Sequence, residues 1–464
     1  MFYDDLSALQ TPLPEDIRRF IDFGDIARAR RVIEMRLRDE GLPEMLRTRL
    51  KLEMQMLERI PGDFPYTFDA ALELLQKEID GFTARELNDA IDAGWVNWIF
   101  LNGELRLHRL FLHTLIKVRP HLAPRVLNPE RLAYKQENFA LLDAVIDEMQ
   151  RNGGAARRWH MRHTLRVKPE WERPGELIRV DLPLPVEYDC VKNFRLLDCG
   201  PVLGVVASPT AAQRTITFEK ALSPGDVFFA AYSFEIHMCC HALDPELARG
   251  GRPTDGDYLA EQPPHIAFTP LIRAFAREIA GDETNPLRLA RRVYDALTTR
   301  PIYSYMRSYF TYPNLSEYLL TDMKGDCGVF ALAFIALCRC LGVPARWQSG
   351  LYCAPHDVDC HDWAQFYCEP WGWLPVDVSF GNAAWHAGSR TRWDFFFGHM
   401  DPFRLPAARQ FQAPFDRPKA HLRSDPYDNQ NGEAEYRDAG LLRGQFEERC
   451  EMVEGETIEL KIDN

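Results

Sequence analysis

The segment KGDCG, residues 324–328, opens the part of the sequence that decides the fold. It runs directly into residues 329–341, where apolar side chains recur at three- and four-residue steps. This spacing predicts a buried helix that ends at Gly342. Cys327 is then expected at the helix N-terminus, capped by Asp326, where free N–H groups and the helix dipole favour thiolate over thiol.

Two strand signals follow this helix, over residues 361–367 and 373–380, with a turn signal at residues 369–372 between them. The midpoint between His361 and Asp377 falls in that turn, so the two residues should face each other, or nearly so, on antiparallel strands. A histidine held by a carboxylate, in front of a cysteine at a helix start, predicts a Cys-His-Asp catalytic triad.

These motifs resemble the transglutaminase-like superfamily, whose catalytic core is papain-like. The resemblance rests on Cys327, on His361-x-Trp363 and on Val376-Asp377, with 34 residues from Cys to His and 16 from His to Asp. A strand signal after the helix, at residues 343–350, also fits. The resemblance implies a catalytic helix packed on an antiparallel sheet, and chemistry through a thioester.

An oxyanion hole requires hydrogen-bond donors near the nucleophile. The backbone N–H of Cys327 is the first candidate, and Tyr303 and Tyr305 are candidates for a second donor. The resemblance implies such an upstream side chain, commonly Trp or Gln, for which this sequence has no clear match.

A competing interpretation places a structural zinc ion on Cys353, His356 and Cys360. The segment lacks a second Cys-x-x-Cys pair, which disfavours this interpretation. The sequence also has no acidic cluster with the spacing of a calcium loop. We therefore expect no metal and no cofactor.

The composition limits the possible partners and compartment. The chain has 464 residues, 46% of them hydrophobic, and a formal net charge of −13. The negative charge argues against nucleic acid or an anionic membrane as the main partner. The first residues lack a signal-peptide pattern, and no apolar run is long enough to span a membrane. The 11 scattered cysteines are then expected to be reduced, in the cytoplasm. The oligomeric state stays open.

The helical and strand patterns in successive parts of the sequence predict an α+β protein with several domains. We expect a helical domain over residues 1–155, an antiparallel β-sandwich over 156–243, and the transglutaminase-like catalytic domain over 258–420. A C-terminal extension over 421–464 is expected to be partly exposed.

Two segments carry more local predictions. Asn102-Gly103 is a tight-turn signal that could join two short strands or only link helices. The polar, acidic residues 421–440 predict an exposed loop. The alternating pattern of residues 441–460 could pair back as strands.

The function expected from the triad and the resemblance is cleavage or transfer of an amide bond, with a peptidase or amidase favoured. The substrate would be a peptide or protein that offers a peptide bond or an amide side chain. The same triad allows transamidation of glutamine. A third possibility is a binding scaffold with a vestigial triad.

Overall fold

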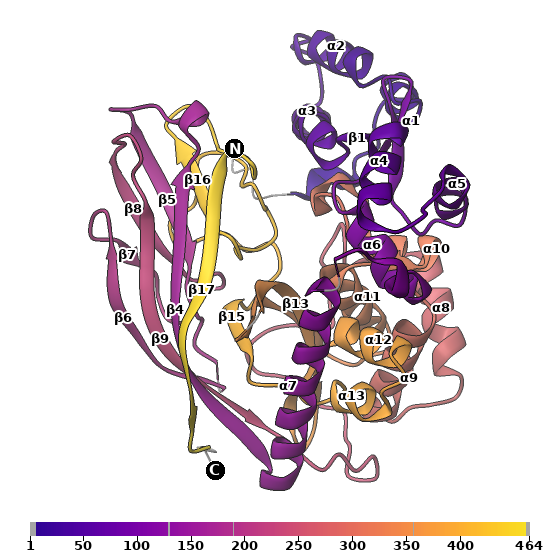
Figure 1. Cartoon of the computed structure of the whole chain (residues 1–464), viewed down its shortest axis with the longest axis vertical. Helices are drawn as coiled ribbons and strands as arrows, with labels where there is room; N and C mark the ends of the chain where they lie inside the picture. Colours follow the sequence, from indigo (N-terminus) through magenta and orange to yellow (C-terminus); the bar gives the residue numbers. More distant parts are fainter. Residues whose placement is uncertain (1–5, 129, 189, 356, 461–464) are drawn as a thin grey trace.

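A computed structural model describes residues 6–128, 130–188, 190–355 and 357–460. Two parts lie side by side in Figure 1: a layer of long strands and a part rich in helices. Helix α7 (Glu130–Asn152) runs along the junction and packs on strand β4 (Gly154–Val167), which follows it in the chain. The fold class predicted from the sequence, an α+β protein with several antiparallel sheets, is confirmed.

The N-terminal region is mostly helical, because apolar residues recur there at helical spacing. Its helices are α1 (Glu15–Asp22), α2 (Ile26–Leu37), α3 (Glu44–Asp63), α4 (Phe68–Glu78), α5 (Ala84–Asp92) and α6 (Phe111–Val118), with the short 3-10 helices η1 (Leu6–Gln10) and η2 (Pro120–Arg125). Asn102 and Gly103, both with positive φ, join the antiparallel strands β2 (Trp98–Leu101) and β3 (Glu104–Leu107). The first of the two outcomes left open for this turn is therefore correct. Strand β1 (Tyr66–Thr67) completes the small sheet.

The strand layer consists of two antiparallel four-stranded sheets. One has the order β17-β4-β9-β6, and the other has the order β16-β5-β8-β7. The further strands are β5 (Leu177–Pro183), β6 (Val191–Gly200), β7 (Val205–Val206), β8 (Thr215–Ala221), β9 (Phe228–Cys239), β16 (Glu433–Tyr436) and β17 (Phe446–Ile458), with the 3-10 helix η3 (Pro169–Trp171). Strands β16 and β17 come from the C-terminal extension, so residues 156–243 do not contain the whole sandwich.

The remaining part packs helices against the antiparallel sheet β14-β13-β12-β15. Its helices are α8 (Pro270–Ala280), α9 (Pro286–Thr299), α10 (Leu315–Asp322), α11 (Cys327–Cys340), α12 (Val378–His386) and α13 (Arg390–Phe395), with the 3-10 helix η4 (Tyr309–Thr311). Its strands are β10 (Ile302–Tyr303), β11 (Lys324–Gly325), β12 (Ala345–Ala354), β13 (Asp357–Cys368), β14 (Gly372–Val376) and β15 (Arg404–Ala408). Helix α11 is buried from Gly328 to Arg339, and its Phe334 ring lies 6.1 Å from the ring of Phe366 on β13.

The second strand predicted in the triad hairpin is too long. Strand β14 ends at Val376, and residues 378–380 begin helix α12 instead. Asp377 caps this helix by accepting a hydrogen bond from the backbone N–H of Phe380. The alternation of apolar and polar residues does not reveal that the strand gives way to a helix here. The better signal is Asp377 itself, because aspartate is a favoured N-cap residue.

The exposed loop predicted for residues 421–440 is wrong. Four consecutive residues of this segment are more than 90% buried between the sandwich and the sheet β14-β13-β12-β15: Tyr427, Asp428, Asn429 and Gln430. Polar composition misleads here because hydrogen bonds satisfy these side chains inside the protein. Gln430 Nε2, for example, donates hydrogen bonds to Asp362 Oδ1 and to the backbone oxygen of His361.

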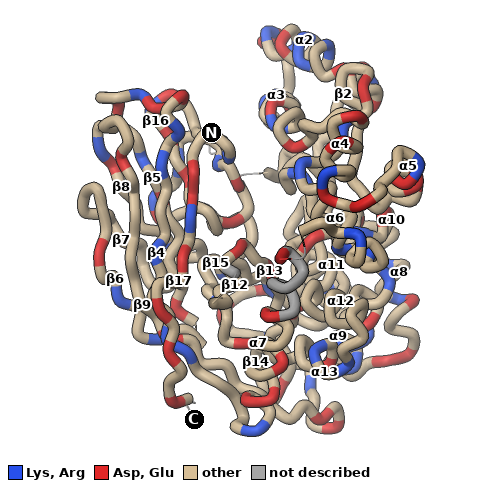
Figure 2. Tube along the Cα trace, viewed as in Figure 1, with Lys and Arg blue, Asp and Glu red and all other residues tan. Residues whose placement is uncertain are grey.

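Charged residues of both signs are mixed along the N-terminal helices and along the outer strands (Figure 2). Within the described part of the chain, no helix combines the length and the apolar character that crossing a membrane requires.

Candidate active site

Cys327 is the first residue of helix α11, as its sequence motif predicted. Asp326 caps the helix, accepting a hydrogen bond from the N–H of Val329 at 3.4 Å. The apolar side chains of helix α11 pack in the core. This packing fixes the position of Cys327 at the start of the helix.

His361 on β13 and Asp377 at the start of α12 come together. The distance from His361 Nε2 to Asp377 Oδ2 is 2.7 Å. Burial alone would raise the pKa of Asp377, but the charges of His361 and Arg404 outweigh it and hold that pKa well below its usual range. Because Nε2 faces the carboxylate, a proton exchange between His361 and another group would use Nδ1.

Arg404 on β15 supports this pair, although the sequence analysis did not single it out. Its Nη1 donates to Asp377 Oδ2 at 2.9 Å, and its Nη2 donates to Asp401 Oδ2 at 2.6 Å. All three side chains are fully buried. Only the folding of β15 beside β12 brings Arg404 close to Asp377, so spacing along the chain carries no signal for it.

The Cys327 thiol donates a hydrogen bond to Asp362 Oδ2, at 3.5 Å. Burial of the thiol, followed by the negative charges of Asp362 and Asp326, raises the pKa of Cys327 well above its usual value. The expectation of a thiolate favoured by the helix dipole is therefore wrong for this arrangement. Burial of the sulfur is the largest cause, and the charges of Asp362 on β13 and Asp326 at the helix start add to it, against the helix dipole.

Asp362 belongs to a buried group of carboxyl side chains. Burial raises the pKa of Asp326 to about 6, and burial with the charge of Asp425 raises the pKa of Asp428 to about 7. The pKa of Asp362 is raised by burial and by the charges of Asp428 and Asp326. These carboxyl groups beside the Cys327 thiol therefore take up protons at a higher pH than exposed aspartates do.

The C-terminal segment contributes a further contact to this site. Gln430 Nε2 donates to Asp362 Oδ1 at 2.7 Å and to the backbone oxygen of His361 at 3.1 Å. The segment that the sequence placed in an exposed loop thus forms a wall of the site.

Tyr309 and Gly328 complete the surroundings of the thiol. The Tyr309 hydroxyl donates to Asp326 Oδ1 at 2.5 Å and lies 3.4 Å from Asp362 Oδ2. A Cβ atom at Gly328 would lie 2.6 Å from Asp362 Oδ2 and would also collide with the Tyr309 hydroxyl. Glycine is therefore required here for the close approach of both side chains.

The two predicted oxyanion tyrosines differ in their placement. Tyr303 on β10 pairs with Gly325 on β11, two residues before Cys327. Burial raises the pKa of Tyr303, and the charge that Cys327 would carry as a thiolate raises it further. Tyr305 instead packs edge-on against Tyr303, and its backbone oxygen accepts a hydrogen bond from Asn97. Tyr309, a third tyrosine in the same segment, contacts Asp326 and Asp362, the two carboxyl groups around the Cys327 thiol.

His356, one of the proposed zinc ligands, lies outside the described residues. Cys353 is fully buried on β12, and the Cys360 thiol donates to Asn431 Oδ1 at 2.9 Å. The residues that the structure describes contain no group of three or more side chains placed to hold a metal ion.

The geometry can be compared with known proteins. Residues 273–378 match the family model of the transglutaminase-like superfamily, and this range includes Cys327, His361 and Asp377. The chain contains a transglutaminase-like domain. None of the curated proteins matches the chain.

Two solved structures are similar to this chain. "A Putative Cysteine Protease" from Cytophaga hutchinsonii is 14% identical, with a TM-score of 0.40, over 67% of this chain and 94% of that chain. The periplasmic domain of TgpA from Pseudomonas aeruginosa is 18% identical, with a TM-score of 0.29, over 54% of this chain and 95% of that chain. Because both TM-scores are below 0.5, the family assignment rests on the matched domain.

Asp362→Asn is expected to lower the pKa of Cys327, because it removes the carboxylate in contact with Sγ. A decrease of about one unit would make alkylation by iodoacetamide near neutral pH roughly tenfold faster. The measurement is the pH dependence of alkylation at Cys327, located by mass spectrometry.

Asp359→Asn is the matched control, because Asp359 lies on the same strand but is exposed. Its alkylation profile should equal that of the wild type. Equal profiles for Asp362→Asn and the wild type would contradict the role assigned to Asp362.

Proposed function

We propose that this protein is a cysteine amidohydrolase that cleaves an amide bond of a peptide or protein through a thioester at Cys327. The observation that carries the proposal is the 2.7 Å contact between His361 Nε2 and Asp377 Oδ2, in a matched domain whose helix α11 begins at Cys327. A histidine oriented by a buried carboxylate is the arrangement that activates a cysteine nucleophile.

In the first step, the Cys327 thiol transfers its proton to Nδ1 of His361, and the resulting thiolate attacks the carbonyl carbon of the amide. The imidazolium ion is stabilised by Asp377, which Arg404 holds in place. The negative charge on the carbonyl oxygen would be stabilised by the backbone N–H of Cys327, with Tyr303 or Tyr309 as the side-chain donor.

In the second step, the carbon–nitrogen bond breaks, and the leaving amine takes the proton from His361, which leaves a thioester on Cys327. His361 then removes a proton from water, and the hydroxide attacks the thioester. The products are a carboxylate and the restored thiol. The raised pKa of Cys327 favours the thiol in the free protein, so the thiol proton would move to His361 as the sulfur attacks.

The experiment that tests this proposal uses a set of glutamine-containing peptides, each incubated with the full-length protein with and without a primary amine such as methylamine. Mass spectrometry separates the outcomes. Peptide cleavage or glutamine deamidation indicates hydrolysis, and an amine adduct on glutamine indicates transamidation. We expect hydrolysis. Adducts as the dominant product would replace the proposal by transamidation, and an unreactive protein would indicate a scaffold with a vestigial triad.

A further inference from the structure

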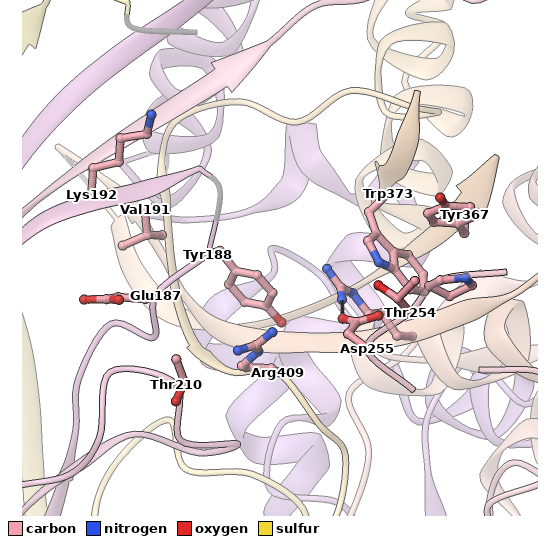
Figure 3. Close-up of a pocket in the computed structure, with 12 residues that line it drawn as sticks. Glu187, Tyr188, Val191, Lys192, Thr210, Thr254, Asp255, Tyr367, Trp373 and Arg409 are labelled. Atoms are coloured by element: carbon pink, nitrogen blue, oxygen red, sulfur yellow. Dashed lines mark hydrogen bonds and ion pairs between the residues drawn. The ribbon is translucent and has the colours of Figure 1, made fainter. Parts of the chain in front are cut away.

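A cavity lies away from Cys327, His361 and Asp377, where the β-sandwich meets the sheet β14-β13-β12-β15. Its volume is about 650 Å³, within the range of small-molecule sites. Figure 3 shows Tyr188 and Arg409 in its middle, with Glu187 and Thr210 at one end and Trp373 at the other. The cavity therefore joins residues of the two parts of the protein.

Arg346 on β12 forms a buried part of the lining, with 5% of its surface exposed. Its Nε donates to Gln365 Oε1 and its Nη1 to Asp255 Oδ2, each at 2.8 Å. Among the described residues, nothing accepts a hydrogen bond from its Nη2. Trp373 packs under the guanidinium group at 3.9 Å from the ring centroid, which holds the group in place.

Arg409, just after β15, is the second cation of this cavity. Its Cζ lies 5.0 Å from the centroid of the Tyr188 ring, and Cζ of Arg346 lies 5.4 Å from the same centroid. Two guanidinium groups therefore flank one aromatic ring. Within the described part of the chain, no carboxylate forms an ion pair with Arg409, whereas Arg346 is paired with Asp255.

Unused guanidinium N–H groups bind carboxylate or phosphate oxygens strongly, because the hydrogen bonds are charge-assisted. The aromatic and apolar side chains of Tyr188, Trp373 and Val191 supply a surface for a planar group. We propose that this cavity binds a small organic anion, with its carboxylate or phosphate on Arg409 and Arg346 and its planar ring against the aromatic side chains. This site is separate from the amide chemistry proposed at Cys327.

The test is isothermal titration calorimetry of the full-length protein with phenyl phosphate, benzoate and uncharged phenol. We expect saturable binding of at least one anion, weaker binding at higher salt, and no comparable binding of phenol. Tighter binding of phenyl phosphate would identify a phosphate site, and tighter binding of benzoate a carboxylate site. Cys327→Ala should bind the same anion unchanged, so the result does not depend on the proposed function.

Arg409→Gln should weaken binding by roughly tenfold or more, because it removes a charged hydrogen-bond donor. Arg409→Lys keeps the charge but loses the planar guanidinium group. Its affinity for the anion should lie between those of the wild type and Arg409→Gln. Arg417→Gln is the matched control, because Arg417 is half-exposed and paired with Glu219 outside the cavity. Absence of saturable binding of both anions at millimolar concentration, phenol binding as tightly as the anions, or full affinity in folded Arg409→Gln would each overturn the proposal.

Discussion

Replacing Cys327 by alanine is expected to lower the rate of amide cleavage by about 10⁴-fold or more. The nucleophile would be lost while the His361–Asp377 pair stays intact. The remaining activity would come from binding and from the oxyanion donors alone. The measurement is the cleavage rate of the best peptide from the screen, together with a search for the thioester adduct by mass spectrometry under acid quench.

Cys340→Ala is the matched control for this prediction. Cys340 ends the same helix α11 and is partly exposed, far along the helix from the site. Its variant should cleave the peptide at nearly the wild-type rate. Equal losses in the two variants would show that the defect is in folding, and full activity in Cys327→Ala would remove Cys327 from the mechanism.

Replacing Arg404 by methionine is expected to destabilise the catalytic part by about 3–5 kcal/mol, the usual cost of removing one partner of a buried ion pair. Two buried carboxylates, Asp377 and Asp401, would lose their cationic partner. The pKa of Asp377 should then rise, since the Arg404 charge helps to keep it low. The loss would appear as a lower midpoint in urea unfolding followed by circular dichroism.

Arg390→Met provides the comparison for this variant. Arg390 pairs with Asp394 at 2.8 Å on the same part of the protein, but its side chain is 66% exposed. An exposed pair contributes little, so the loss should be below about 1 kcal/mol. If Arg404→Met were no less stable than Arg390→Met, the buried network around Asp377 would not have the importance given to it.

The Arg404→Met variant also allows the effect on stability to be separated from the effect on the cleavage rate. Arg404→Met should reduce cleavage even at temperatures where the variant is folded, because Asp377 would no longer be held against His361. A folded Arg404→Met with the wild-type rate would show that His361 and Asp377 orient each other without help.

Several elements follow from local sequence patterns alone. Helix α11, for example, begins at Cys327 behind its Asp326 cap, as its periodicity and its capping residue predicted. Helix periodicity, capping residues and turn signals act over a few neighbouring residues, so a single sequence contains them in full. The contact between His361 and Asp377 was also predictable, because a short hairpin connects the two strands.

Other features depend on contacts between segments far apart in the chain. The C-terminal strands β16 and β17 complete the sandwich, and Gln430 reaches Asp362 across 68 residues. The side chain of Asp362 is only 4% exposed and accepts a hydrogen bond from the Cys327 thiol. Its environment comes from Tyr309, Gly328 and the C-terminal segment, none of which is near it in the sequence.

The sequence by itself predicted Cys327 at the start of a helix and His361 beside Asp377, because each occupies a motif defined by near neighbours. Only the tertiary structure determines the surroundings of the Cys327 thiol. The pKa of Cys327 depends on burial and on the charges of Asp362 and Asp326, and these act through space. A helix dipole can be anticipated from the sequence, but a second carboxylate that packing places beside the thiol cannot.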